Sequence, residues 1–350
     1  MTLTAAIAQP ARRSDRPVVA WLIVTAAMIL LMVVIGGITR LTESGLSITE
    51  WQPVSGTLPP LSDAAWAAAF DSYKQIPQYA ELHAGMSLDE FKSIFFWEYV
   101  HRLWGRLIGL VAILPPLVFL AQGRIRRDQA LRYLAVPVLV GLQGVLGWYM
   151  VKSGLSVRTS VSQYRLTAHL ALAVAIYGYV IWLAAGLLDR GVKGFEPGLL
   201  RPAARAVLGL ATLTLLAGGF MAGLHAGLTY NSFPLMDGKL VPDGYFLLQP
   251  WWLNPFENIT AVSFDHRWLA ISTLCAVILL WLAARGRPLP RAARLPLDLM
   301  LAMVFIQVVL GISTLLLVVP IPLAAAHQTG AILLFTCALL TVHGLRRADR

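Results

Sequence analysis

Eight long apolar segments, each poor in charge, constrain the fold of this chain more than any other feature. A membrane-spanning helix needs about 20 apolar residues to cross roughly 30 Å of hydrocarbon. The segments of this kind are 18–39, 98–121, 133–151, 166–188, 206–226, 266–284, 299–319 and 323–343. The last two come from one uncharged stretch, which Pro320 and Pro322 divide because proline ends a helix. The sequence therefore predicts an all-α, polytopic membrane protein with eight transmembrane helices.

Composition excludes the main alternatives to a membrane protein. Of the 350 residues, 57% are hydrophobic and only 13% are charged, and the mean hydropathy is +0.68. A soluble domain carries about 25% charged residues, so a soluble globule and a disordered chain are both excluded. Cys275 and Cys337 both fall inside apolar segments. We therefore expect membrane-buried thiols and no disulfide framework.

The basic residues predict the orientation of the chain in the membrane. Five segments hold 18 of the 28 basic residues against six of the 18 acidic ones. These segments are 1–17, 122–132, 189–205, 285–298 and 344–350. Basic residues concentrate in cytoplasmic loops, so both termini are predicted to be cytoplasmic. The net charge of +10 then reflects topology, and no nucleic-acid partner is expected.

Two further features of the first half need an interpretation. The first apolar segment is longer than a secretory core and lacks a small-x-small cleavage site, which favours an uncleaved first helix. A twin-arginine signal at Arg12-Arg13 is the weaker alternative. The outer loop 40–97 is long enough to suggest a function. Short helices are predicted in it around residues 62–73 and 87–95.

The two halves of the chain resemble each other, with four matches in the same order. The matches are 36–46 with 218–228, His101-Arg102 with His266-Arg267, Gln143 and Gly147 with Gln307 and Gly311, and Ala168-His169 with Ala326-His327. Each half holds four helices in the same orientation, so the repeat is parallel, about an axis along the membrane normal. We expect two pseudo-symmetric four-helix bundles. Their domain ranges are 1–190, which includes the outer loop 40–97, and 191–350.

Four of the repeated residues are the histidines His101, His169, His266 and His327. Each is predicted in the first turns of an even-numbered helix, near the outer face. A single histidine there is commonly a snorkelling or hydrogen-bonded residue. Two pairs at equivalent positions instead favour iron ligands, because imidazoles from facing helices can hold a planar porphyrin. Heme is therefore the favoured group, with one site in each half.

Other metal sites and other histidines are disfavoured. A di-iron carboxylate site would need a repeated Glu-x-x-His ladder, and a structural zinc site would need cysteines near the histidines. The sequence has neither of these patterns. The histidines without a match are assigned no ligand role: His83, His225 and His343.

The halves differ in one residue that bears on chemistry. Glu98 precedes His101 by three residues, which places both side chains on one helical face. The equivalent of Glu98 in the second half is Ser263. This asymmetry favours a reacting first half and an electron-carrying second half, although Glu98 could equally be an interfacial acid, paired with Arg102 or solvated. Arg102 and Arg267 could contact heme propionates or only mark the interface.

Several motifs of this chain resemble those of the heme A synthase family, in the branch shared by alphaproteobacteria and mitochondria. The motifs are residues 40–51, continued by Pro53, Gly56, Pro59 and Pro60, with 98–102, 231–238, 264–267 and 326–328. The resemblance covers essentially the whole chain. Some bacterial members carry a cysteine pair in outer loops, which this sequence lacks. A thiol-based step of that kind is therefore not expected.

The resemblance implies an activity and a role for each site. Members of this family are oxidoreductases that convert a methyl group of heme O to a formyl group by two hydroxylations. The product, heme A, serves cytochrome oxidase. By resemblance, His266 and His327 hold a heme B cofactor, and His101 and His169 lie at the substrate heme. The residue matching Glu98 is implicated in catalysis.

The same resemblance implies the surroundings of the protein. The expected location is the cell inner membrane, with the heme sites near the periplasmic side. Expected partners are heme O, the lipid bilayer, an electron donor of unknown identity, and, as candidates, heme O synthase and cytochrome oxidase assembly factors. One alternative is a non-enzymatic di-heme electron-transfer or heme-handling membrane protein. A secondary transporter is a third reading, but it predicts a midplane site.

Overall fold

The computed structural model describes residues 15–51, 55–155, 159–188 and 196–346. This part of the chain is helical, without strands, and contains eight helices long and apolar enough to span a membrane, which confirms the prediction. They are α1 (Arg16–Leu41), α4 (Leu88–Ala121), α5 (Ala130–Lys152), α6 (Gln163–Leu188), α7 (Leu200–Gly223), α9 (Ile259–Ala284), α10 (Arg291–Leu316) and α11 (Ile321–Gly344). The shorter helices are α2 (Asp63–Tyr73), α3 (Pro77–Leu82) and α8 (Asn254–Glu257), with single 3-10 turns at Ser55–Thr57, Arg127–Gln129, Ala226–Leu228 and Trp251–Leu253.

One predicted helix boundary is wrong. The predicted short helix at 87–95 is the beginning of α4, because Ser87 and Glu90 form a capping box and no proline or glycine separates 87–95 from the spanning segment that begins at residue 98. His101 therefore lies well inside α4 instead of in its first turns. In contrast, α2 agrees with its predicted range, and the side chain of Ser62 caps it. The prolines do separate α10 from α11, as expected.

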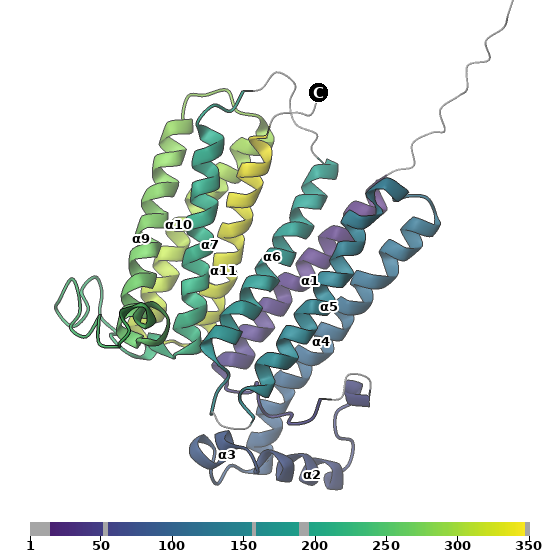
Figure 1. Cartoon of the computed structure of the whole chain (residues 1–350), viewed down its shortest axis with the longest axis vertical. Helices are drawn as coiled ribbons and strands as arrows, with labels where there is room; N and C mark the ends of the chain where they lie inside the picture. Colours follow the sequence, from purple (N-terminus) through teal and green to yellow (C-terminus); the bar gives the residue numbers. More distant parts are fainter. Residues whose placement is uncertain (1–14, 52–54, 156–158, 189–195, 347–350) are drawn as a thin grey trace, which may run out of the picture.

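The spanning helices form two groups that lie side by side (Figure 1). In the first group α1 contacts α4 and α6, and α5 contacts α4 and α6. In the second group α7 contacts α9 and α11, and α10 contacts α9 and α11. The order of contacts around each group is thus the same, and the pseudo-symmetry of the two bundles stays a prediction. The predicted domain division at residue 190 lies outside the described residues, as does the pair Arg12-Arg13.

The two groups meet along a seam formed by α1 and α6 on one side and α7 and α11 on the other. The seam is closely packed: a Cβ placed on Gly178 of α6 would lie 3.0 Å from Cζ of Phe335 on α11. The hydroxyls of Tyr177 and Thr336 also share a hydrogen bond of 2.9 Å across it. The seam therefore joins the halves by both apolar and polar contacts.

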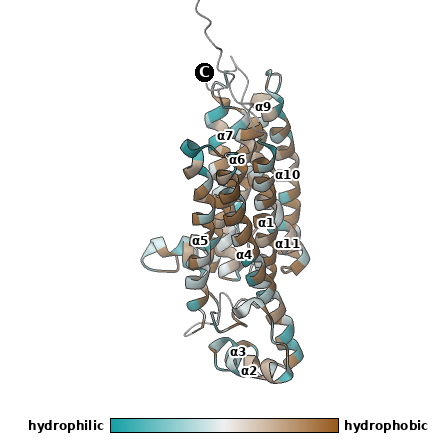
Figure 2. Cartoon of the chain, turned by 90° about the vertical axis from the view of Figure 1, so that its right-hand side faces the viewer, coloured by the Kyte–Doolittle hydropathy of each residue, from teal (hydrophilic) through white to brown (hydrophobic). Residues whose placement is uncertain are grey.

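The surface of the helices is apolar over most of their length, and the polar residues gather at the ends (Figure 2). Residues on the outward faces expose large apolar side chains, such as Val138 at 63%, Leu279 at 65% and Val309 at 64%. A water-soluble protein does not expose such a continuous surface, whereas lipid covers it without cost. Cys275 and Cys337 are both free thiols within spanning helices, as predicted.

The connection from α1 to α4 has a core of its own. Leu46, Phe70, Tyr73, Phe91 and Phe95 are buried together there, and the Phe70 and Phe91 rings stack with centroids 4.9 Å apart. We call residues 42–51 and 55–87 the outer segment. Because α2, α3 and the start of α4 form this core, the outer segment is a folded cap at one end of the first group (Figure 1).

Candidate functional site

Each of the four repeated histidines packs against a glycine of a neighbouring helix in its own half. A Cβ on Gly36 of α1 would lie 3.3 Å from Nε2 of His101, and one on Gly147 of α5 would lie 3.0 Å from Cε1 of His169. In the second half the corresponding distances are 3.3 Å from Gly218 to His266 and 2.9 Å from Gly311 to His327. These close approaches explain why the glycines repeat together with the histidines.

The repeated glutamines have an equivalent explanation. Gln143 Nε2 donates to the backbone carbonyl of His169 at 2.9 Å, and Gln307 Nε2 donates to that of His327 at 2.8 Å. A helical carbonyl already accepts one hydrogen bond, and its second lone pair is free for a side-chain donor. Each glutamine therefore ties the histidine-bearing helix to its neighbour at the level of the imidazole.

The histidine pair of the second half fits a metalloporphyrin. The ring centroids of His266 and His327 are 6.5 Å apart, with an interplanar angle of 90°. A metal–imidazole bond is about 2 Å long and each ring centre lies about 1 Å beyond its nitrogen, so two axial imidazoles have centroids roughly 6 Å apart. In the described part of the chain, the buried Nδ1 atoms of both rings lack a hydrogen-bond partner. The pair thus has the spacing and the available nitrogens of axial ligands.

Among the described residues no group of three or more histidine, cysteine, aspartate or glutamate side chains could hold an ion. Of the first-half pair, His169 also has a buried Nδ1 without a partner in the part of the chain that the structure describes.

Glu98 is buried and fully hydrogen-bonded. It is 2% exposed; its Oε2 accepts from Ser47 Oγ and from the backbone N–H of Ile48, both at 2.7 Å. Its Oε1 accepts from Nη2 of Arg102 at 2.7 Å. The sequence left open whether Glu98 is paired with Arg102 or solvated. The structure supports the ion pair with Arg102. Glu98 thereby connects the helix of His101 to the outer segment.

The two repeated arginines bind the chain that follows the first helix of their own half. Arg102 donates to the carbonyls of Ile48 and Glu50 at 2.7 and 2.9 Å. Arg267 donates to the carbonyls of Tyr230 and Ser232 at 2.6 and 2.7 Å. The accepting residues are themselves separated by the repeat offset of 182. Their contact with heme propionates stays a prediction, and each already has a structural role.

The second half lacks the carboxylate at the equivalent place. Ser263 is fully buried, and its hydroxyl has no hydrogen-bond partner in the described part of the chain. Asp265 instead accepts a hydrogen bond of 2.7 Å from the hydroxyl of Tyr245 in the outer connection. Burial raises the pKa of Tyr245 to about 12, so this hydroxyl remains a donor at neutral pH. The chemical asymmetry between the halves is therefore present in the structure as well as in the sequence.

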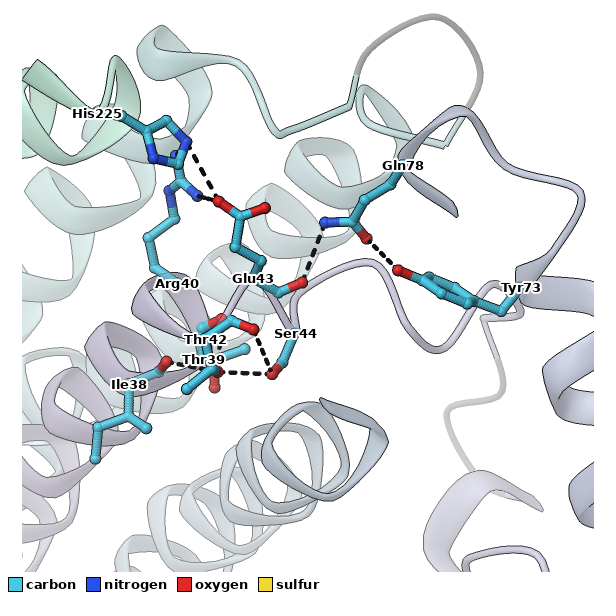
Figure 3. A network of polar contacts seen from close by, with 9 residues as sticks. All are labelled: Ile38, Thr39, Arg40, Thr42, Glu43, Ser44, Tyr73, Gln78 and His225. Carbon is cyan, nitrogen blue, oxygen red and sulfur yellow. Dashed lines mark hydrogen bonds and ion pairs between the residues drawn. The ribbon is translucent and has the colours of Figure 1, made fainter. Parts of the chain in front are cut away.

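A polar network at the end of the seam nearest the outer segment was not predicted. His225 was assigned no ligand role, and its Nε2 instead bonds to the guanidinium of Arg40 and lies 3.8 Å from Oε1 of Glu43 (Figure 3). Glu43 and His225 are separated by the repeat offset of 182, so equivalent residues meet across the seam. Burial lowers the pKa of His225, Arg40 lowers it further, and Glu43 opposes them. His225 is thus neutral at neutral pH and can accept from Arg40.

The same network reaches the outer segment. Gln78 Nε2 donates to the carbonyl of Glu43 at 3.1 Å, and its Oε1 accepts from the hydroxyl of Tyr73 at 3.0 Å (Figure 3). His83, also without a predicted ligand role, contacts the same hydroxyl at 2.6 Å. Burial raises the pKa of Tyr73, with Glu43 and Glu98 acting in the same direction. The only sequence signal for this network was the offset that relates Glu43 to His225.

Comparison with known proteins identifies the family of this chain. Residues 19–339 match the COX15-CtaA family, described as cytochrome oxidase assembly protein. A heme A synthase of Nitrosospira multiformis is 52% identical over 95% of this chain and 94% of its own length. Those of Nitrosomonas eutropha and Parvibaculum lavamentivorans are 47% and 50% identical, over 97% and 93% of this chain and 96% and 94% of their own lengths. With a match that extends from the first spanning helix to the last, this chain belongs to the COX15-CtaA family.

Proposed function

We propose that this protein is a heme A synthase, an oxidoreductase that converts a methyl group of heme O to the formyl group of heme A. The observation that carries the proposal is the presence of two histidine pairs, each seated against glycines at equivalent positions of the two halves. The relatives named heme A synthase cover nearly all of the chain, so they support the same activity. The product would serve cytochrome oxidase.

The second half holds the proposed heme B cofactor between His266 and His327. The centroid distance and the buried Nδ1 atoms support this assignment. When bound, the heme would supply one-electron redox chemistry, which protein side chains cannot supply. The chain's own contribution is to fix the imidazoles: Gly218 and Gly311 admit the rings, and Gln307 holds the backbone of His327.

The first half holds the proposed substrate, heme O, at His101 and His169. Glu98 lies one helical turn before His101, so its carboxylate could orient a water or stabilise positive charge at the methyl carbon. The hydrogen bonds from Ser47, Ile48 and Arg102 support such a role, because they hold the carboxylate in one position. Arg102 and Arg267 remain the candidates for propionate contacts.

The proposed setting is the cell inner membrane, with both termini in the cytoplasm and both heme sites near the periplasmic side. The basic segments support this orientation. The long outer connections, including the outer segment, would then lie on the periplasmic side. The proposed partners are an electron donor of unknown identity, heme O synthase and cytochrome oxidase assembly factors.

The assignment of the two sites is tested by removing one ligand at a time. His266→Ala and His327→Ala should each abolish the low-spin heme B spectrum of the purified protein. His101→Ala and His169→Ala should keep that spectrum and lose heme O binding. An unaltered bis-histidine spectrum in both second-half variants would reject the assignment.

The activity and the role of Glu98 are tested by co-expression with heme O synthase, followed by extraction and mass spectrometry of the hemes. The wild-type chain should yield heme A, whereas unchanged heme O would favour a heme carrier. Glu98→Gln should lower conversion about 100-fold, the scale of a lost general acid–base group. Glu257→Gln, an exposed change that keeps a partner for Tyr164, is the matched control. Full conversion by Glu98→Gln would exclude a catalytic role for this residue.

A further inference from the structure

The first helix of each half carries two adjacent glycines, and the second glycine of each pair faces the other half. A Cβ on Gly37 of α1 would lie 2.2 Å from Oε1 of Gln328 on α11. A Cβ on Gly219 of α7 would lie 3.0 Å from Oγ1 of Thr167 on α6. Gln328 follows His327 in the sequence, and Thr167 precedes His169 by two residues. Each of these contacts therefore involves a helix that carries one proposed heme ligand, α11 with His327 or α6 with His169.

Of the two side chains that face these glycines, Gln328 forms a hydrogen bond, whereas the Thr167 hydroxyl has no partner in the described part of the chain. Gln328 Nε2 donates to the carbonyl of Val33 at 2.8 Å, which links residues 295 positions apart. Val33 lies four residues before Gly37, so its carbonyl also belongs to the helical ladder of α1, and the missing Cβ lets the amide approach it. The residue equivalent to Gln328 in the first half is Leu170, which cannot donate such a bond. The hydrogen bond of Gln328 thus has no counterpart at the equivalent position of the first half.

This link connects the two histidine sites by a short path. Gln328 is bonded to His327 through the backbone, and Val33 is less than one helical turn from Gly36, the glycine that contacts His101. Any displacement of α11 along α1 would therefore move the ligand of the second site relative to the ligand of the first. Van der Waals packing alone tolerates small sliding, whereas the partly buried amide–carbonyl bond resists it, because leaving either group unpaired costs free energy.

We propose that Gln328 is a positioning residue that fixes the alignment of the cofactor heme relative to the substrate heme across the seam. This inference rests on the proposed function. When both hemes are bound, they would supply one-electron exchange, in which one centre is oxidised as the other is reduced. Its rate would depend on their distance and orientation, and Gln328 would fix both by holding α11 against α1.

The test uses Gln328→Met, which keeps the side-chain length and removes the donor. Heme B content, its bis-histidine spectrum and the Kd for heme O should stay within about twofold of the wild type, while kcat for heme O conversion falls by roughly tenfold. The dipolar relaxation between the two ferric hemes, measured by pulsed electron paramagnetic resonance, should change in the same variant. Wild-type values for both kcat and the dipolar relaxation would overturn the proposal.

A control and a double variant separate positioning from packing. Thr167→Val is the matched control, because it changes the contact with Gly219 at a hydroxyl that has no hydrogen-bond partner in the described residues. Its kcat and dipolar relaxation should equal those of the wild type. In Gly37→Ala/Gln328→Ala the new methyl group occupies space that the amide leaves. Recovery of kcat in this double variant would show that packing is sufficient and would overturn the proposal.

The failure of this inference can be distinguished from failure of the proposed function. If the wild-type chain formed no heme A, the proposed function would be wrong, and the dipolar measurement would still decide the role of Gln328. If the wild type formed heme A and Gln328→Met matched it in both readouts, only the inference would be wrong. A variant that loses heme B altogether would assign Gln328 to cofactor binding and would also overturn it.

Discussion

His225 and Glu43 show how a single pair of residues can join two halves of a repeat. Both adopt left-handed backbone, with φ of 52° and 56°, at the equivalent points where the chain leaves α7 and α1. Non-glycine residues seldom take this conformation, so its occurrence at both positions is further evidence of the repeat. Because the first half has glutamate at this position and the second half has histidine, the carboxylate of Glu43 meets the imidazole of His225 across the seam.

This pair predicts a pH dependence of stability. The pKa of His225 is lowered in the folded protein, whereas the unfolded chain takes up its proton near pH 6.5. The stabilisation is therefore complete above that pH and is lost as pH falls through it towards the folded pKa. Between pH 7.5 and 5.5, the melting temperature of the purified protein should fall, and His225→Gln should reduce that fall by about 2 °C. An equal fall in the variant would contradict this role, and His83→Gln is the comparison outside the seam.

At the scale of the elements, the glycines decide how closely the helices of each half approach. Gly144 and Gly147 lie one turn apart on α5, but a Cβ on Gly144 would meet nothing within 4 Å. A Cβ on Gly147 would lie 3.0 Å from the His169 ring. Packing therefore requires glycine at position 147 but not at position 144. The two positions can thus be compared with each other on one helix.

We expect opposite results from alanine at these two positions. Gly147→Ala should weaken heme O binding about tenfold, because overpacking of this kind costs on the order of 1–3 kcal/mol. Gly144→Ala should leave binding unchanged and stabilise the protein by up to about 1 kcal/mol, because alanine is the better helix former. A titration of each purified variant with heme O measures the first effect and thermal unfolding measures the second. Equal affinities in the two variants would show that the glycine contact does not shape the site.

At the scale of the whole molecule, an even number of spanning helices places both ends of the chain on one side of the membrane. The basic segments at the ends and between α4 and α5, α6 and α7, and α9 and α10 predict that this side is the cytoplasm. Alkaline phosphatase fused after Leu240 should be active, and the same enzyme fused after Arg350 should be inactive. Green fluorescent protein at these positions should give the reverse result. An active phosphatase at the C-terminal fusion would reject the orientation.

The sequence by itself determined the number of spanning helices, their breaks and the equivalence of the four histidines. These features depend on local properties: the length of apolar segments, the position of prolines and the spacing of repeated residues. Even the boundary error at α4 has a local cause, since the capping box at Ser87 continues directly into the apolar segment.

Only the tertiary structure decided which side chains meet. Glu98 binds Ser47 and Ile48, and Gln328 reaches Val33 across most of the chain length. Such contacts depend on the rotation of each helix about its axis and on how the outer segment folds back, and both are set by packing between distant elements. A pattern along one helix carries no information about this rotation relative to its neighbours. For that reason the sequence left open whether Glu98 is solvated or paired with Arg102, and the fold shows it bound to Arg102, Ser47 and Ile48.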